Sequence, residues 1–151
     1  MVARTDSLVN RSGGRGRWSD ALPRFALELE GHADANPSTV VSLDWGFHEP
    51  LLFLTDRTLL LEPIWALPRA LQRGRPWAHQ GDAQTIYLVH DTPYDLFGLG
   101  PSLLTTARAL PPEQVEIRPH RDREGEISFL SVRFLGPHQL LYTGRFSLRF
   151  L

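Results

Sequence analysis

Two β-rich apolar runs constrain the fold of this sequence more than any other feature. Residues 40–43 read Val-Val-Ser-Leu and lead to Asp44, and residues 85–89 read Thr-Ile-Tyr-Leu-Val and lead to His90 and Asp91. Near-continuous apolar runs of this length are typical of parallel strands that are buried on both faces of a sheet. Polar residues that follow such strands meet at one edge of the sheet, so we expect any functional site at that edge.

The remaining periodicity predicts helices alternating with strands over the first two thirds of the chain, and mainly strands after that. The expected helices cover residues 20–30, 47–54, 64–71 and 102–110, and the expected strands cover residues 39–44, 58–62, 85–89, 114–120, 127–135 and 146–150. Residues 75–82 and 91–98 are expected to form loops. Residues 136–138 begin either a return strand or a docking tail.

This order of elements predicts an α/β fold, with a three-layer sheet, βαβ crossovers in the first two thirds and a C-terminal antiparallel β-hairpin region. Right-handed crossovers place strand 39–44 at the centre of the sheet, with strands 58–62 and 85–89 on either side. The hairpin is formed by residues 114–120 and 127–135.

Length and charge bound the organisation of the chain. With 151 residues the sequence predicts a single α/β domain over residues 18–151, preceded by a flexible basic tail or linker over residues 1–17. The tail carries four arginines against one aspartate, while the formal charge of the whole chain is -1. We therefore expect no nucleic-acid partner. No stretch approaches the roughly 20 apolar residues of a membrane span, and the lack of cysteine does not fix a compartment.

Eight residues near the carboxyl ends of the three parallel strands form the candidate ligand site. They are Asp44, Trp45 and His48 after the first strand, Glu62 and Trp65 at the end of the second, and His90, Asp91 and Tyr94 after the third. Aromatic walls with a few carboxylates and imidazoles suit a polar ligand, such as a sugar or a phosphate-linked head group. The alternative interpretation is structural: Asp44 caps the turn at Gly46, Trp45 belongs to the core and His48 lies on the surface.

The same edge carries side chains that metals favour, since oxygen and nitrogen ligands occur at Asp44, His48, Glu49, His90 and Asp91. However, the sequence has no HExxH motif, no cysteine pair and no closely spaced pair of histidines. It therefore predicts neither a metal site nor a cofactor. A nucleophilic triad is not predicted either, because no serine lies in a G-x-S-x-G motif and Ser42 lies inside a strand.

Five segments carry a resemblance to a known family. They are Trp18-Ser19-Asp20-Ala21, Val41-Ser42-Leu43-Asp44-Trp45-Gly46, Leu51 to Thr55, Glu62-Pro63 and Ile86-Tyr87-Leu88-Val89-His90. In this order and spacing they resemble the soluble extracytoplasmic domain that follows the membrane helices in some bacterial proteins of glycosyltransferase family 39, the protein mannosyltransferase-like group. The resemblance covers roughly residues 18–135.

The resemblance implies a role rather than a reaction. Proteins of this group are multi-spanning enzymes that take a sugar from a polyprenyl-phosphate donor, and their catalytic acid lies in a loop between membrane helices. Nothing in this sequence matches that loop, so no catalytic residue is carried over. The implied role is an accessory domain on the extracytoplasmic face of a bacterial membrane, contacting glycan or acceptor. Its implied partners are the membrane-embedded remainder of the same protein and a glycan or polyprenyl-phosphate sugar.

Two other classes of function stay open. The first is a stand-alone, cytoplasmic α/β hydrolase that uses Asp44 with His90 or Asp91. Such an enzyme would lose turnover on Asp44→Asn or His90→Ala while staying folded, whereas an accessory domain has no turnover to lose. The second is a protein-interaction module anchored by Trp65, Trp77 and Tyr94, since aromatic side chains dominate binding surfaces.

Overall fold

The computed structural model describes residues 14, 18–31, 39–55, 60–62, 77–90, 92, 94–142 and 148–150. Its elements in chain order are α2 (Ala21–Gly31), β1 (Thr39–Ser42), α3 (His48–Leu54), β2 (Leu60–Glu62), β3 (Trp77–Gly81), β4 (Thr85–Val89), α5 (Leu99–Arg108), the 3-10 helix η2 (Pro112–Gln114), β5 (Val115–Arg121), β6 (Ile127–Phe134), β7 (His138–Tyr142) and β8 (Leu148–Phe150). The expected tail over 1–17 (apart from Gly14) and the expected helix over 64–71 lie outside the described residues.

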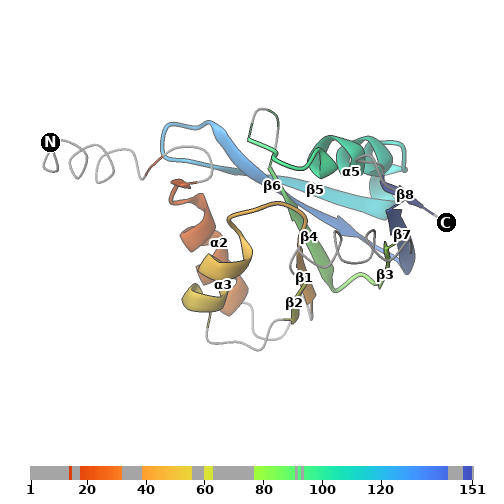
Figure 1. The fold of residues 1–151 in the computed structure, drawn as a ribbon, viewed down its shortest axis with the longest axis horizontal. Helices are drawn as coiled ribbons and strands as arrows, with labels where there is room; N and C mark the ends of the chain where they lie inside the picture. The colour runs from red at the N-terminus through yellow and green to blue at the C-terminus, as the bar shows by residue number, and fades with distance from the viewer. Residues whose placement is uncertain are drawn as a thin grey trace, which may run out of the picture.

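Five strands form the main sheet in the order β2-β1-β4-β6-β5. β1 lies between two parallel neighbours, and its Val40 is paired with Leu61 of β2 on one side and with Ile86 of β4 on the other. The predicted position of this strand between those two neighbours is therefore confirmed, although the middle strand of the five is β4. Figure 1 shows β1, β2 and β4 side by side, with β5 and β6 running past them towards α5.

The antiparallel half of the main sheet confirms the predicted hairpin. β6 pairs with β4 on one side and with β5 on the other, and both pairings are antiparallel. β5 is an edge strand, with a register shift between His120 and Arg121. It also contains Pro119, which has no N–H to offer a further strand, and charged residues and proline are common means of protecting an exposed edge.

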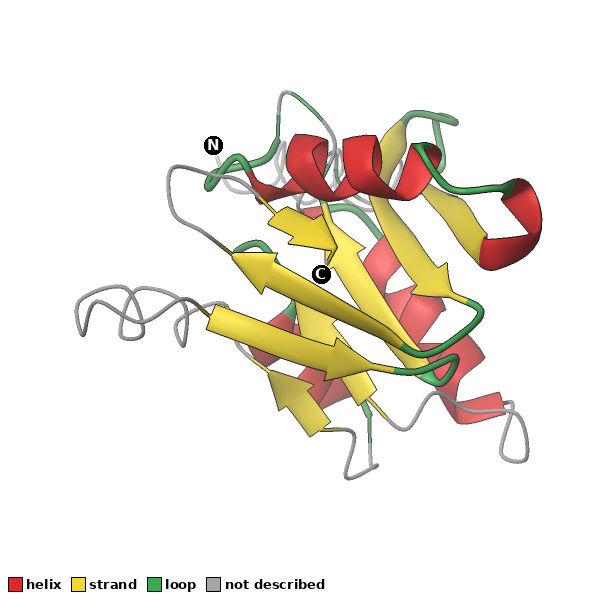
Figure 2. Cartoon of the chain, turned by 90° about the vertical axis from the view of Figure 1, so that its right-hand side faces the viewer, coloured by secondary structure: helices red, strands yellow, loops and turns green. Residues whose placement is uncertain are grey.

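The second sheet corrects one prediction. β3, β7 and β8 form a three-stranded antiparallel sheet, in which β3 pairs with β7. The expectation of a loop over 75–82 is therefore wrong for residues 77–81. This segment has no β-branched residue and no alternation of apolar and polar residues, so its strand conformation depends on a partner distant in the chain. The same pairing decides between the two readings of residues 136–138, because His138 begins a return strand (Figure 2).

Successive residues of the central strands point to opposite faces, and each face packs against different helices. Val40 of β1 and Leu88 of β4 pack with buried residues of α2 and α3, whereas Val41 and Val89 pack with buried residues of α5. The mixed α/β class is confirmed. The three-layer arrangement with βαβ crossovers stays a prediction.

The helix before residue 110 begins earlier than predicted. We expected it from Ser102, but α5 begins at Leu99. Gly98 lies before it with φ 69°, a left-handed conformation that glycine adopts at little cost. Pro101 falls in the first turn, where its missing N–H has no helical partner to lose. The helix therefore includes residues whose composition favours a loop.

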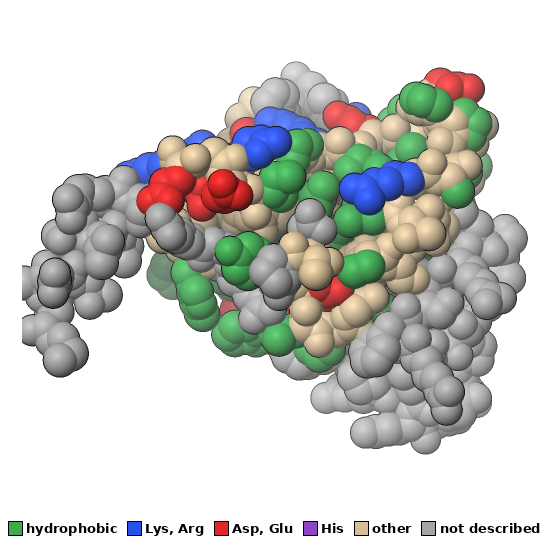
Figure 3. Space-filling model, turned by 90° about the horizontal axis from the view of Figure 1, so that it is seen from above, with side chains coloured by type: hydrophobic (Ala, Val, Ile, Leu, Met, Phe, Trp, Pro, Cys, Tyr) green, Lys and Arg blue, Asp and Glu red, His purple; other side chains and the backbone are tan. Residues whose placement is uncertain are grey.

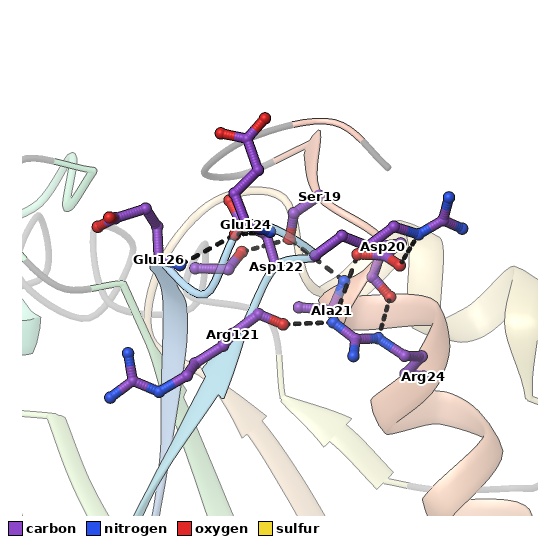
Figure 4. Close-up of polar contacts among 10 residues, drawn as sticks. Ser19, Asp20, Ala21, Arg24, Arg121, Asp122, Glu124 and Glu126 are labelled. Carbon is purple, nitrogen blue, oxygen red and sulfur yellow. Dashed lines mark hydrogen bonds and ion pairs between the residues drawn. The ribbon is translucent and has the colours of Figure 1, made fainter. Parts of the chain in front are cut away.

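Polar contacts tie the N-terminus of α2 to the turn of the β5–β6 hairpin (Figure 4). Asp20 accepts a hydrogen bond from Nε of Arg123 at 2.7 Å, and Arg24 contacts both Asp20 and the backbone oxygen of Arg121. Two buried serines add a further contact between the same elements, since the hydroxyls of Ser19 and Ser128 lie 2.6 Å apart. Seen from above in Figure 3, the coloured residues show acidic and basic side chains interspersed on this face.

Candidate functional site

The centre of the predicted site is a hydrogen-bonded pair formed by Asp44 and His90. Asp44 follows β1 and His90 follows β4, and because the two strands are parallel neighbours both residues lie at the same edge of the sheet. Nδ1 of His90 donates to Oδ2 of Asp44 at 2.8 Å. Only 1% of Asp44 and 2% of His90 is exposed. The sequence predicts this proximity, but it gives no sign that the pair is buried.

Backbone amides complete the environment of the Asp44 carboxylate. Oδ1 accepts from the amide of Trp45 at 2.7 Å, and the amide of Leu96 lies 3.3 Å from both carboxylate oxygens. The first of these contacts resembles the turn-capping role considered as the structural alternative, and the second joins the loop after β4 to β1. The carboxylate therefore has three hydrogen-bond donors within the protein, which meets the requirement of a buried anion.

Two residues that the sequence did not single out shape the surroundings of His90. The ring of Phe47, itself buried, stacks on the imidazole with centroids 4.2 Å apart and planes at 17°. On the backbone side, a Cβ at Gly100 would lie 2.4 Å from the His90 carbonyl oxygen. Only glycine therefore lets the first turn of α5 approach so closely.

Asp95 adds a second carboxyl group to this edge. Its Oδ1 accepts from the amides of Phe97 and Gly98, each at 3.1 Å, whereas its buried Oδ2 has no hydrogen-bond partner of standard geometry. Burial is the largest cause that raises the pKa of Asp95, and the nearby Asp44 carboxylate raises it further, against the lowering effect of the amides. Asp95 therefore takes up a proton more readily than an aspartate in water does.

Replacing Asp95 by asparagine tests whether its pKa is raised in the folded protein. Because the folded-state pKa lies above the unfolded one, wild-type stability declines as the pH rises through the folded-state pKa. We expect Asp95→Asn to be more stable than the wild type at pH 7 by no more than about 1 kcal/mol, since solvent screens this half-buried group. The advantage should vanish below pH 3.8, the ordinary pKa of an aspartate. Urea unfolding at both pH values measures it, and a pH-independent difference would contradict the assignment.

An aromatic pair lies beside the buried polar pair and reaches solvent. The rings of Trp18 and Trp45 pack edge to face with centroids 5.7 Å apart, and 72% of Trp18 and 37% of Trp45 is exposed. The reading of Trp45 as a core residue is therefore wrong. The exposed side chains of Tyr94 and Leu96 belong to the loop whose amide contacts Asp44. Trp18 was missed as a site residue because it precedes the first predicted helix, far from any strand end.

The other predicted residues are less closely gathered. His48 is the first residue of α3 and is partly exposed, and its Nδ1 is buried without a hydrogen-bond partner. Glu62 is the last residue of β2, opposite Val41 in the register. Trp65 and Asp91 lie outside the described residues.

The described residues offer little support for nucleophilic or metal chemistry at this edge. Ser42 is buried within β1, and its hydroxyl has no hydrogen-bond partner. Within the described ranges, no three side chains of His, Asp or Glu are arranged so that they could hold a metal ion. What the edge combines is a buried, hydrogen-bonded aspartate–histidine pair and an exposed pair of tryptophans.

Comparisons with protein-family models, with curated proteins and with solved structures find no match to this chain. In the part of the chain that the structure describes, no helix has the length and apolar character needed to cross a bilayer. The resemblance to glycosyltransferase family 39 stays an expectation from the quoted segments.

Proposed function

We propose that this chain is an accessory binding domain of a glycosyltransferase-like membrane protein, with no chemistry of its own, and that it contacts glycan or acceptor through Trp18 and Trp45. The observation that carries the proposal is the exposure of these two adjacent rings beside a buried polar pair. Large exposed aromatic side chains mark binding surfaces, because their apolar faces lose unfavourable contact with water when a ligand covers them. A sugar ring offers an apolar C–H face of matching size.

The geometry of the polar pair favours binding over catalysis. A general acid or base must reach a proton of the substrate within hydrogen-bond distance. Asp44 instead directs its carboxylate to His90 and to two backbone amides, and Phe47 covers the imidazole. The pair thereby fixes the ends of β1 and β4 and the loop that carries Tyr94. On this proposal its role is to hold the binding surface in place.

The resemblance supplies the wider setting of the proposal. The domain would lie on the extracytoplasmic face of a bacterial membrane, attached to the membrane-embedded remainder of the same protein, and its ligand would be a glycan or a polyprenyl-phosphate sugar. The proposed three-layer arrangement would place the tryptophan pair at the strand-end edge where ligands gather in such folds. Reading the source DNA upstream of Met1 tests this setting. A frame that continues through apolar segments supports it, and a stop codon directly upstream contradicts it.

Trp45→Ala is expected to weaken sugar binding at least about tenfold, because aromatic anchors contribute most of the affinity of small interfaces. Titration of the protein with mannobiose, followed by tryptophan fluorescence and by amide shifts in NMR spectra, measures the loss. Phe53→Ala is the matched control, since Phe53 is an aromatic residue on α3 that is 91% exposed and has no part in the pair. Equal loss in both variants, or no binding by the wild type, would contradict the proposal.

A small hydrolase is the second candidate, favoured by the 2.8 Å contact between His90 and Asp44, in which a carboxylate orients an imidazole. The same samples distinguish it from the binding domain. Cleavage of the sugar probe that disappears in a folded Asp44→Asn variant would favour the hydrolase. Binding without cleavage favours the accessory domain.

A further inference from the structure

A groove lies at the opposite end of the main sheet from the tryptophan pair. β6 runs antiparallel to β4, and Arg133 near the end of β6 is paired with Ile86 near the start of β4. The groove lies past Arg133, where β6 ends and the chain continues to β7. Its volume is about 340 Å³. The lining residues used below come from η2, from the end of β6 with the residue after it, and from the start of β7: Glu113, Gln114, Phe134, Leu135, His138 and Gln139.

Hydrogen bonds hold both walls of the groove in place. The amide of Leu135 donates to the carbonyl oxygen of Gln114 at 2.9 Å, and the amide of Gln114 donates to the carbonyl oxygen of Pro111 at 2.9 Å. These bonds join η2 to the end of β6. A groove whose walls are ordered before binding needs less ordering when a ligand arrives.

Hydrogen bonds to both ring nitrogens also hold the imidazole of His138, another lining residue of the groove. Its Nδ1 donates to the carbonyl oxygen of Gly136 at 3.2 Å, and its Nε2 accepts from the hydroxyl of the fully buried Tyr87 at 2.7 Å. The His138 ring packs closely against the backbone of Gly81. A Cβ at position 81 would lie only 2.5 Å from Nε2 of His138, so a glycine is needed there. Burial is the main cause that lowers the pKa of His138, so the ring is neutral at pH 7.

The chemistry of the lining selects the kind of ligand. Glu113 brings a negative charge, and none of the lining residues brings a positive charge at neutral pH, so anions such as phosphates are disfavoured. The exposed amide side chains of Gln114 and Gln139 can both donate and accept hydrogen bonds. Leu135, which is 44% exposed, supplies an apolar surface, whereas only 2% of Phe134 is exposed. Hydroxyl groups, which also donate and accept, are the matching partners.

We propose that this groove is a second binding site, which takes a neutral polyhydroxyl compound of about one sugar ring. Its volume is at the small end of the roughly 300–1,000 Å³ of small-molecule sites, and its mixed amide, carboxylate and apolar lining matches a ring with hydroxyl groups on its edge. The site does not depend on Trp18 or Trp45, which lie at the other end of the sheet.

The test is a titration with mannose, followed through backbone and side-chain amide signals in NMR spectra. We expect shifts at Gln114, Leu135 and Gln139, and loss of these shifts in the double variant Gln114→Ala/Gln139→Ala. Trp45→Ala should keep them, so failure of the tryptophan site and failure of the groove are separately visible. Choline and inorganic phosphate serve as a cationic and an anionic probe.

Three outcomes would overturn the proposal. They are no shift in the groove at the highest soluble mannose concentration, shifts that the double variant retains, and stronger binding of choline or phosphate than of mannose. Because both replaced glutamines are exposed, the double variant is expected to fold. An unchanged amide spectrum away from the groove verifies this.

Discussion

Replacing Asp44 by alanine is expected to lower the free energy of unfolding by about 3–5 kcal/mol, since a buried donor left without its acceptor costs about 1–3 kcal/mol and the Asp44 carboxylate serves several. The variant leaves the buried imidazole of His90 without its carboxylate and the amides of Trp45 and Leu96 without their acceptor. Three donors would lose their acceptor at once, and the side chains of Asp44 and His90 are themselves almost fully buried. Urea unfolding at pH 7 measures the change.

Asp20→Ala is the matched control for this prediction. Asp20 is also an aspartate that forms ion pairs, but Arg24 and Arg123 contact it near the surface, where such pairs contribute about 1 kcal/mol or less. Asp44→Asn should fall between the two, because its side-chain oxygen still accepts from a backbone amide. A loss below about 1 kcal/mol in Asp44→Ala would mean that the pair at the strand ends does not hold this edge of the sheet together.

The second large effect is expected from acid. His120 is buried on β5, stacked on Phe129 with ring centroids 4.4 Å apart, and its Nε2 lies 2.9 Å from the hydroxyl of Ser131. Burial, together with the charges of Arg118 and Arg24, lowers the pKa of His120 from 6.5 to about 4. The folded protein therefore favours the neutral ring.

The sign of the pH dependence follows from this lowered pKa. The unfolded chain binds a proton at His120 near pH 6.5, whereas the folded chain binds it only near pH 4. The stabilisation by the neutral ring is fully present above pH 6.5 and is lost as the pH falls towards 4, by about 3 kcal/mol in total. His120→Phe should remove this part of the slope between pH 7 and pH 4. A variant slope equal to that of the wild type would show that His120 is not the group responsible.

His138→Gln is the control for the acid experiment. Burial also lowers the pKa of His138, but this ring is only partly buried, so its share of the slope should be smaller. The variant should therefore keep most of the wild-type decline between pH 7 and pH 4. Unfolding by urea at several pH values compares the three proteins on one scale.

The main sheet was predictable because its signals are local. β4 matches the predicted strand 85–89, and the hairpin of β5 and β6 lies within a residue of its predicted bounds, since alternation and apolar runs are properties of neighbouring residues. β3 could not be found in this way. Its sequence from Trp77 to Gly81 has no strand pattern, and only the pairing with β7 gives it that conformation.

In the candidate site, too, the contacts that follow from strand order could be predicted, whereas those made by residues from other elements could not. The rule that parallel strands end at one edge predicted that Asp44 and His90 come together. Their burial depends on Phe47, which folds back over His90, and the aromatic surface depends on Trp18, which approaches Trp45 from before α2. Neither contact is encoded by spacing along one element. Sequence patterns therefore predict which edge carries the site better than which atoms reach solvent there.

The pairing of β3 with β7 has a consequence for synthesis on the ribosome. β3 leaves the ribosome before its partner, because β4, α5, β5 and β6 all lie between the two strands in the chain. Until residues 138–142 have been translated, the backbone N–H and C=O groups of residues 77–81 lack their β7 partners. A nascent chain stalled in this interval exposes a free strand edge, the kind of surface on which other chains aggregate. Synthesis of β7 thus covers an edge that would otherwise be open to pairing with other chains.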